Sequence, residues 1–218
     1  VAVAEAAVAV AAAVAVEALL RERLPTSGID VHSHQASLLL EPWAIQTKTG
    51  GPYQVFTPYW RAFLQQVKVG TPLASPTTVP AARERLLAFT RGPLFDYASG
   101  RDLPAVDGTS CLSPHLHFGE ISPRQIWTQV GKASERKGQD TAAWREGRYI
   151  AELVWREFAA HLLHHFPTLP ERPKNAAFER LAWRNEAADF EAWCHGRTGV
   201  ALVDAGMRQL WQTGWMHN

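Results

Sequence analysis

The longest helical pattern in the chain covers residues 142–165 and constrains the fold more than any other feature. Within it, Glu152, Trp155 and Arg156 occupy positions i, i+3 and i+4, which share one face of a helix. A carboxylate, an aromatic plane and a guanidinium on one face can stack on a flat ring, accept hydrogen bonds from a base edge and bind a phosphate. The pattern therefore predicts a flavin or nucleobase pocket. The alternative is a buried Trp beside a surface salt bridge, since aromatic residues at helical spacing usually belong to a core.

Helical patterns occur on both sides of this stretch. They cover residues 81–89, 123–132, 187–195 and 203–212. By contrast, residues 38–59 are rich in Gly, Pro and Thr, which predicts a loop. The chain is therefore expected to be mainly α.

The N-terminal part predicts a different kind of domain. Residues 28–32 alternate apolar and polar side chains after a turn, as a strand does, and the proline-rich residues 68–80 indicate a connector. A helix, a short loop and a strand suggest the end of an α/β unit. We therefore expect residues 1–45 to be the end of an α/β domain, residues 46–80 an interdomain connector and residues 81–218 a helical domain.

The overall charge does not point to a nucleic-acid-binding protein. The chain has 22 Lys and Arg against 21 Asp and Glu, a formal charge of +1, so any contact with DNA must be local. Its two cysteines, Cys111 and Cys194, fit neither a metal-ligand spacing nor a disulfide framework. This usage favours a reducing compartment, and we expect a cytoplasmic protein.

The first twenty residues are almost entirely Ala and Val. They fit either a membrane span or a buried helix or strand-plus-helix of a soluble domain. The apolar run between Glu5 and Glu17 is short for a bilayer, which favours the second interpretation, and no membrane contact is expected. No signal-peptide pattern supports secretion.

Hydroxyl side chains gather in residues 108–123. Ser113 before Pro114 predicts a capped helix start, and Ser122 with Gln125 predicts a capping box. Thr109 and Ser110 add two hydroxyls near the first helix start, which makes a site for a phosphate or pyrophosphate. Simple helix capping is the alternative.

A metal site is not expected. The histidines His161, His164 and His165 lie at helical spacing, but no set of carboxylates or cysteines accompanies them.

Four blocks of the sequence resemble class I DNA photolyases, members of the photolyase and cryptochrome family of light-driven flavoproteins. The blocks, in the family's order, are residues 54–63 (QVFTPYWRAF), 108–127 (GTSCLSPHLHFGEISPRQIW), 152–158 (ELVWREF) and 196–218 (GRTGVALVDAGMRQLWQTGWMHN). The resemblance implies an all-helical FAD-binding domain preceded by the tail of a Rossmann-like α/β antenna domain and a long connector. It also implies an interior fragment that ends inside the helical domain.

The resemblance implies contacts with FAD for residues that match the family's flavin pocket. These are Tyr97, Thr109, Ser110, Cys111, Leu112, Ser113, Tyr149, Glu152 and Arg156. Cys111 stands where a basic residue is common in the family, and Tyr149 where some members have a Trp.

The resemblance also implies a surface for ultraviolet-damaged DNA. The matching residues are Arg101, Glu152, Trp155, Arg156, Trp215 and Asn218. Trp183 matches the outermost tryptophan of the chain that passes electrons to the flavin, so Trp183 and Glu152 are the catalytic candidates. Arg101 as an ordinary partner of Asp102, and Asn218 as a helix cap, are the structural alternatives.

The implied activity is blue-light-driven repair of cyclobutane pyrimidine dimers by a monomer. Excited reduced FAD would donate an electron to a flipped-out dimer. The pair His217-Asn218 is typical of dimer repair, whereas enzymes for (6-4) photoproducts have two histidines there. An antenna chromophore, folate or deazaflavin, is also implied, and Glu171 after Pro170 disfavours folate. The alternatives are a cryptochrome-like photoreceptor without repair and a non-functional fragment without flavin.

Overall fold

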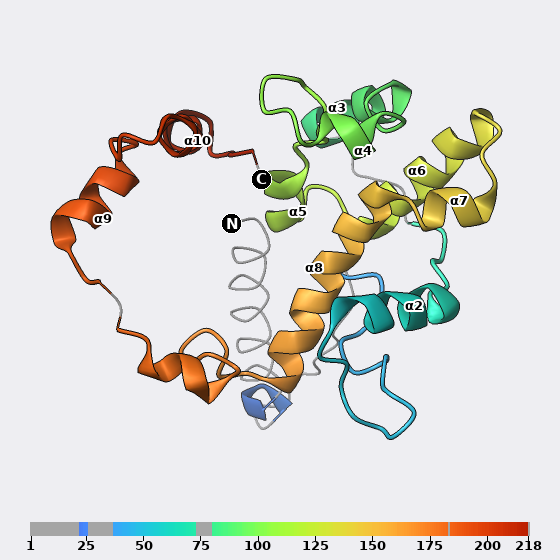
Figure 1. Ribbon diagram of the computed structural model, residues 1–218. Coiled ribbons are helices and arrows are strands. Elements are labelled where there is room, and N and C mark those ends of the chain that lie inside the picture. Colours follow the sequence, from blue (N-terminus) through green and yellow to red (C-terminus); the bar gives the residue numbers. More distant parts are fainter. Residues whose placement is uncertain (1–21, 26–36, 73–79, 183, 218) are drawn as a thin grey trace. The chain divides into compact units, whose positions relative to one another are not determined.

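The computed structural model describes residues 22–25, 37–72, 80–182 and 184–217, which form helices joined by loops and turns (Figure 1). The described residues contain no strand. The expected mainly α fold is therefore confirmed. The helices are α2 (Phe56–Gln66), α3 (Pro80–Arg91), α4 (Tyr97–Gly100), α5 (Ser113–His117), α6 (Pro123–Arg136), α7 (Thr141–Arg145), α8 (Arg148–His165), the 3-10 helix η2 (Ala176–Arg180), α9 (Ala187–Cys194) and α10 (Ala201–Thr213).

Several expectations fall outside the described residues. They concern the Ala- and Val-rich segment 1–20, the strand at 28–32, Trp183 and Asn218. The chain divides into two compact units, residues 1–170 and 171–218. The expected domain boundaries after residues 45 and 80 stay a prediction.

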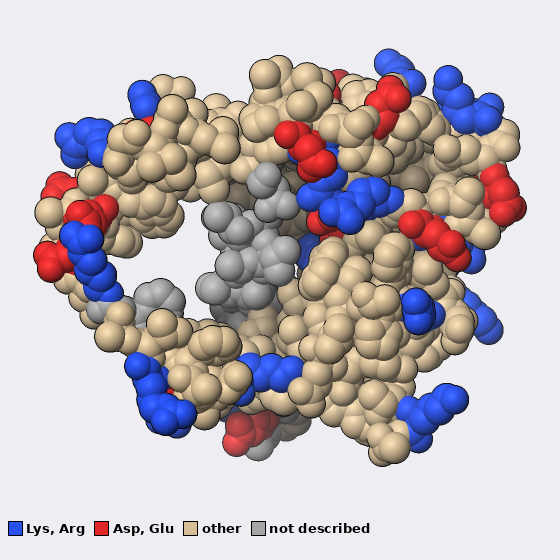
Figure 2. Space-filling model, in the orientation of Figure 1, with Lys and Arg blue, Asp and Glu red and all other residues tan. Residues whose placement is uncertain are grey.

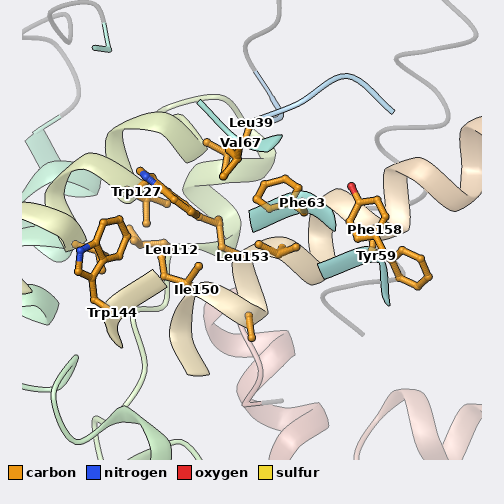
Figure 3. Packing of buried hydrophobic residues seen from close by; sticks show 14 of the residues in the cluster. Leu39, Tyr59, Phe63, Val67, Leu112, Trp127, Trp144, Ile150, Leu153 and Phe158 are labelled. Carbon is orange, nitrogen blue, oxygen red and sulfur yellow. The ribbon is translucent and has the colours of Figure 1, made fainter. Parts of the chain in front are cut away.

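Helix α8 is the central element of the first unit. α2 and α4 pack against it, and its buried side chains Ile150 and Phe158 belong to one hydrophobic cluster with Phe63 of α2 (Figure 3). Val154 of α8 belongs to the same cluster. Phe63 and Val154 are fully buried. Burial of such large apolar side chains stabilises the fold by about 1.5–3 kcal/mol each. The α2–α8 contact therefore contributes much of the stability of this unit.

The long helix expected at residues 142–165 is in fact two helices. α7 ends at Arg145, and Gly147, with φ −64° and ψ 153°, is extended and starts α8. A Cβ atom at Gly147 would lie only 3.0 Å from the carbonyl oxygen of Trp144, so a larger residue at this turn would force its neighbour to shift by a few tenths of an ångström. The spacing of apolar residues in the sequence does not reveal this break, because α7 and α8 both bury apolar side chains in the same core.

The loop expected at residues 38–59 is wrong at its end, because α2 begins at Phe56. The residues that favour a loop include Pro58, but proline is tolerated in the first turn of a helix, where its missing N–H has no intrahelical acceptor.

The two predicted helix starts have different outcomes. Ser122 and Gln125 form the expected capping box, which is confirmed by both reciprocal hydrogen bonds. Ser113 is not a cap: Leu112 takes that position, and Ser113 is already the first residue of α5. Cys111, just before this cap, has a positive φ of 47°, which is uncommon for a residue other than glycine.

Three side chains of α8 hold the segment 37–42 against the helix. Arg156 donates a hydrogen bond to the carbonyl oxygen of Ser37, and the Nδ1–H of His161 donates to the carbonyl oxygen of Pro42 at 2.7 Å. Between them, Glu157 accepts the backbone N–H groups of Leu39, at 2.8 Å, and Leu40, at 3.2 Å. A segment without regular structure thus finds partners for its buried backbone groups on one helix.

Residues 171–218 form the second unit, in which α9 and α10 pack together. Asp204 organises the turn before α10: its carboxylate accepts the backbone N–H groups of Thr198 and Gly199 and the hydroxyl of Thr198. These bonds, the one from the Thr198 hydroxyl above all, hold the pKa of Asp204 below its usual value. None of the helices in the described part of the chain is both long and apolar enough to cross a membrane.

Glu157 gives the fold a dependence on pH. Burial raises the pKa of its carboxyl to about 8, although the amides of Leu40 and Leu39 and the charge of Arg156 favour ionisation. The folded state therefore keeps the proton in a range where the unfolded state has lost it. The free energy of unfolding is expected to fall as pH rises from about 5 to about 8, by roughly 3–4 kcal/mol.

The substitution Glu157→Gln isolates this effect in urea unfolding measured across that pH range. Glutamine keeps an acceptor for the two amides but cannot ionise, so the variant should lack this loss of stability. His161 and His165 have lowered pKa values, and the stability they contribute is lost only as pH falls. Identical pH profiles of the two proteins would show that Glu157 does not titrate in this range.

Candidate functional site

Helix α8 carries four of the predicted site residues, and the structure separates them. Tyr149 and Glu152 contact α4 and the residue after it, Tyr149 through the ring of Tyr97 and Glu152 through Arg101. Trp155 is 37% exposed and stacks on α2. Arg156 reaches the segment before α2, where it donates to Ser37. Glu152, Trp155 and Arg156 share a helix face but not a single contact site, because three different neighbours meet that face.

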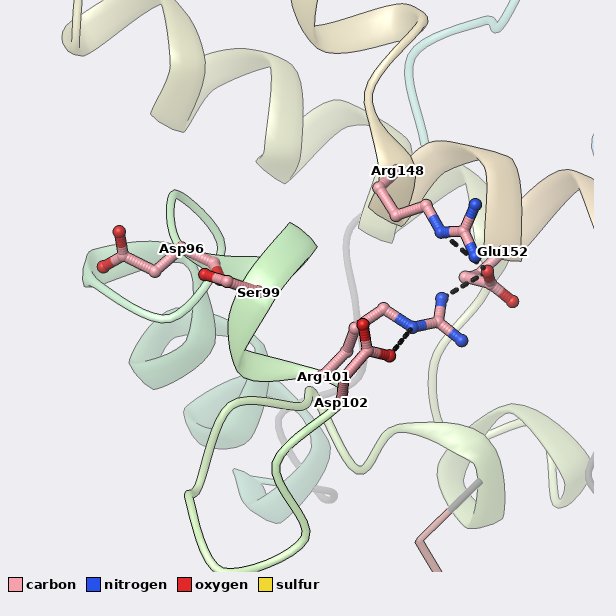
Figure 4. A network of polar contacts seen from close by, with 6 residues as sticks. All are labelled: Asp96, Ser99, Arg101, Asp102, Arg148 and Glu152. Atoms are coloured by element: carbon pink, nitrogen blue, oxygen red, sulfur yellow. Dashed lines mark hydrogen bonds and ion pairs between the residues drawn. The ribbon is translucent and has the colours of Figure 1, made fainter.

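The carboxylate of Glu152 lies between two arginines (Figure 4). Arg101 donates from Nη1 to Oε1 of Glu152, and Nε of Arg148 lies 3.6 Å from the same oxygen, one helical turn away. Nε of Arg101 is also 3.6 Å from Asp102. The Asp102 pairing expected for an ordinary surface arginine thus exists, but the Arg101 side chain is only 13% exposed and its shorter contact is with Glu152.

Aromatic rings lie beside this ion-pair network. The guanidinium of Arg101 sits 5.5 Å from the ring centre of Tyr97, and the rings of Tyr97 and Tyr149 meet edge to face at 5.1 Å. Phe89 of α3 contacts both rings. Burial raises the pKa of both phenols, so both are neutral at physiological pH. The Ser110 side chain is close enough to the Tyr149 phenol to act in the opposite direction and lower its pKa.

The loop Gly108–Ser113 is held against the end of α4. A Cβ atom at Gly108 would lie 2.6 Å from the carbonyl oxygen of Gly100, so glycine is required for this approach. The hydroxyl of Thr109 lies 3.4 Å from the Sγ of Cys111, and Leu112 is buried in the core. Within the part of the chain that the structure describes, no acceptor takes the backbone N–H groups of residues 109–112. These amides, with the partly exposed hydroxyls beside them, can bind an anion.

The remaining predicted residues are not part of this cluster. Trp215 belongs to the second unit, where its ring lies 6.1 Å from that of His217. Trp183 and Asn218 are outside the described residues. The cluster that the structure does bring together consists of Tyr97, Arg101, Thr109, Ser110, Cys111, Tyr149 and Glu152.

No group of three or more His, Cys, Asp or Glu side chains that could hold a metal ion was found among the residues that the structure describes. The three histidines of α8 contact one another through their rings, and His161 is fully buried. Their spacing reflects packing at the end of α8 and the hydrogen bond to Pro42.

Sequence reasoning missed Glu157 and Phe56. Glu157 lies inside the block 152–158, but a carboxylate among apolar residues at i−3, i−4 and i+1 is a signal of burial that could have identified it. Phe56 lies inside the block 54–63, and its contact with Trp155 joins residues 99 positions apart in the chain. A contact at that separation cannot be read from a periodic pattern.

Comparison with known proteins gives a consistent result. A family model described as the FAD binding domain of DNA photolyase matches residues 149–218, and one described as DNA photolyase matches residues 4–81. The deoxyribodipyrimidine photo-lyase of Agrobacterium fabrum is 38% identical, over 94% of this chain and 49% of its own length. Cryptochrome-1 of Arabidopsis thaliana is 30% identical, over 91% of this chain and 35% of its own length.

A solved structure agrees with these relatives. The crystal structure of a bacterial class III photolyase from Agrobacterium tumefaciens superposes with a TM-score of 0.79 at 38% identity, covering 94% of this chain and 49% of that one. A Synechocystis cryptochrome, with a TM-score of 0.74 at 23% identity, supports the fold. The assignment to class I stays a prediction. This chain spans about half the length of the photo-lyase relatives it matches. Two photolyase family models match it in order along the sequence, and the alignments with photolyase and cryptochrome relatives cover nearly all of it. The chain therefore belongs to the DNA photolyase and cryptochrome family.

Proposed function

We propose that this chain carries part of the flavin pocket and lesion-binding surface of a light-driven photolyase that splits cyclobutane pyrimidine dimers in DNA. The observation that carries the proposal is the arrangement on α8. The exposed indole of Trp155 lies one turn from the Glu152 carboxylate, which two arginines flank. Relatives named deoxyribodipyrimidine photo-lyase support the same reading.

The residues of the Gly108–Ser113 loop fit FAD. Its amides, for which the described residues offer no acceptor, and the hydroxyls of Thr109, Ser110 and Ser113 suit a pyrophosphate, while Leu112 anchors the loop in the core. The Tyr149 ring beside this loop offers a surface for the rest of the cofactor. When bound and reduced, FAD would supply the light-driven electron that opens the cyclobutane ring.

The chain's own residues would bind and orient the two linked pyrimidines of the lesion. Trp155 would stack on a pyrimidine dimer flipped out of the duplex, and the carboxylate of Glu152 would accept hydrogen bonds from its base edges. Arg101 and Arg148 would attract the DNA backbone. This role requires Arg101 to exchange part of its contact with Glu152 for a phosphate.

The other predicted contributions belong to the same proposal. Arg156 would act near both cofactor and lesion, Trp215 and Asn218 would contact the lesion, and Trp183 would pass electrons toward the flavin. An antenna pigment, folate or deazaflavin, would bind the α/β domain. The match of residues 4–81 to the DNA photolyase model supports the presence of part of that domain in this chain. We further propose that the protein acts as a monomer in the cytoplasm, in keeping with its two unpaired cysteines.

A cryptochrome-like photoreceptor is the second candidate. It is favoured by the relatives named cryptochrome, which match as much of this chain as the photolyases do. A photoreceptor needs the flavin pocket but not the open indole face of Trp155. A flavin-containing chain that leaves dimers intact under blue light would support this candidate and exclude the repair function.

Released FAD measured after denaturation of the purified chain tests the cofactor site. We expect near-stoichiometric FAD in the unsubstituted chain. Gly108→Ala should weaken FAD binding about tenfold, because a clash with Gly100 that costs about 1–3 kcal/mol displaces the loop. Gly92→Ala is the matched control, since a Cβ atom there meets nothing within 4 Å. Equal FAD content in all three proteins would show that the Gly108–Ser113 loop does not contact the cofactor. Absence of FAD from all three would contradict a cofactor site in this chain.

Trp155→Ala tests the lesion surface. Its affinity for an oligonucleotide with one thymine dimer should fall about 10- to 100-fold, the range expected when a stacking ring is lost, while FAD content stays the same. Trp43→Ala is the control, because Trp43 is 52% exposed and contacts His164 instead. Parallel loss of FAD and of lesion binding would mean that Trp155 is structural. Loss of dimers under blue light and not in the dark would identify repair.

A further inference from the structure

Phe56, the first residue of α2, covers one face of the Trp155 indole. The two rings are nearly parallel, with an angle of 8° between their planes and 3.7 Å between their centres. Phe56 is 9% exposed, whereas Trp155 is 37% exposed. The indole therefore has one face against a buried ring and keeps substantial exposure to solvent.

Phe56 is itself held from other sides. Trp60, one turn further along α2, stacks on Phe56 at 5.6 Å with an interplanar angle of 28°. Phe158 of α8 meets Phe56 edge-on at 5.8 Å and 66°, and meets Trp155 at 5.8 Å and 70°. Edge-to-face and stacked pairs of this kind restrict the orientation of each ring. The covered face of the Trp155 indole therefore packs against aromatic rings that are themselves held in place.

We propose that Phe56 is a positioning residue for the lesion: it holds the Trp155 indole in the plane that stacks on a flipped-out pyrimidine dimer. This inference rests on the proposed function. A large exposed side chain that is free to rotate loses entropy when a ligand orders it, whereas a ring already held in place does not. Because the contact with Phe56 already orders the indole, dimer binding costs less side-chain entropy.

The same contact connects two separate parts of the chain. α2 lies within the residues that match the DNA photolyase model, and α8, from its second residue on, within those that match the FAD-binding model. Phe56 thus brings a determinant of lesion recognition from outside the helical stretch that carries Trp155. The block 54–63 would therefore contribute to lesion binding as well as to the packing of α2.

Two identical substitutions in α2 separate positioning from general packing. Phe56→Leu removes the ring against Trp155, whereas Phe63→Leu removes a fully buried ring, two turns along the helix, whose aromatic contacts are Tyr59 and Trp127. Because Phe63 is the more deeply buried of the two, a purely structural effect should be larger in Phe63→Leu.

The first readout is the position of the indole. In the chain labelled with 5-fluorotryptophan, the fluorine resonance of Trp155 is identified by its loss in Trp155→Phe. Phe56→Leu should shift and broaden this resonance, since the neighbouring ring current and the support are lost, and Phe63→Leu should leave it in place.

The second readout is discrimination, the ratio of affinities for single-stranded oligonucleotides with and without one thymine dimer. Phe56→Leu should lower this ratio about three- to tenfold, the range that an aromatic pair contributes. Phe63→Leu should preserve the ratio. In a Trp155→Ala background, Phe56→Leu should have no further effect, because its action passes through the indole.

Each contrary outcome has a distinct meaning. An unmoved Trp155 resonance, an unchanged ratio, or tighter dimer binding by Phe56→Leu overturns the inference, the last because Phe56 would then be a cover over the binding face. Equal loss of discrimination in Phe63→Leu also overturns it. If the unsubstituted chain does not discriminate at all, the proposed function fails and takes this inference with it, an outcome distinguishable from failure of the inference alone.

Discussion

The burial of α8 is the constraint on which the rest of the first unit depends. One part of this helix packs on α2 through Phe158 and Val154, and another on α4 and its loop through Tyr149 and Glu152. Its last turns hold the segment 37–42 through buried polar contacts. A helix surrounded in this way can place functional side chains with little freedom, because movement of any one of them disturbs the core.

Polar groups do as much as apolar ones to specify this arrangement. A buried carboxylate such as Glu157 is costly, and its two amide hydrogen bonds lower that cost only for one position of the segment 37–42. The ion pair of Arg101 with Glu152 acts in the same way between α4 and α8. The candidate site lies beside the second of these contacts, between the Gly108–Ser113 loop and the face of α8 that carries Tyr149 and Glu152.

Local structure could be predicted where the signal was local. The capping box at Ser122 and Gln125 was found because its partners are three residues apart, and the later helices because their apolar faces repeat. The break at Gly147 and the start of α2 at Phe56 were missed. The two misses have different causes: Gly147 is recognised as a break only by its close approach to Trp144, whereas Pro58 indicates a loop in the sequence but is tolerated in the first turn of α2.

The sequence by itself determined the helical class and the family and predicted which residues surround the Gly108–Ser113 loop, because spacing, capping and motif order are properties of a linear chain. Only the tertiary structure decided how those residues are divided. It placed Glu152 with Arg101, Trp155 with Phe56 and Arg156 with Ser37, although the three share one helical face. The physical reason is that a helix fixes the direction in which a side chain leaves the backbone, whereas the elements packed around the helix decide what that side chain meets.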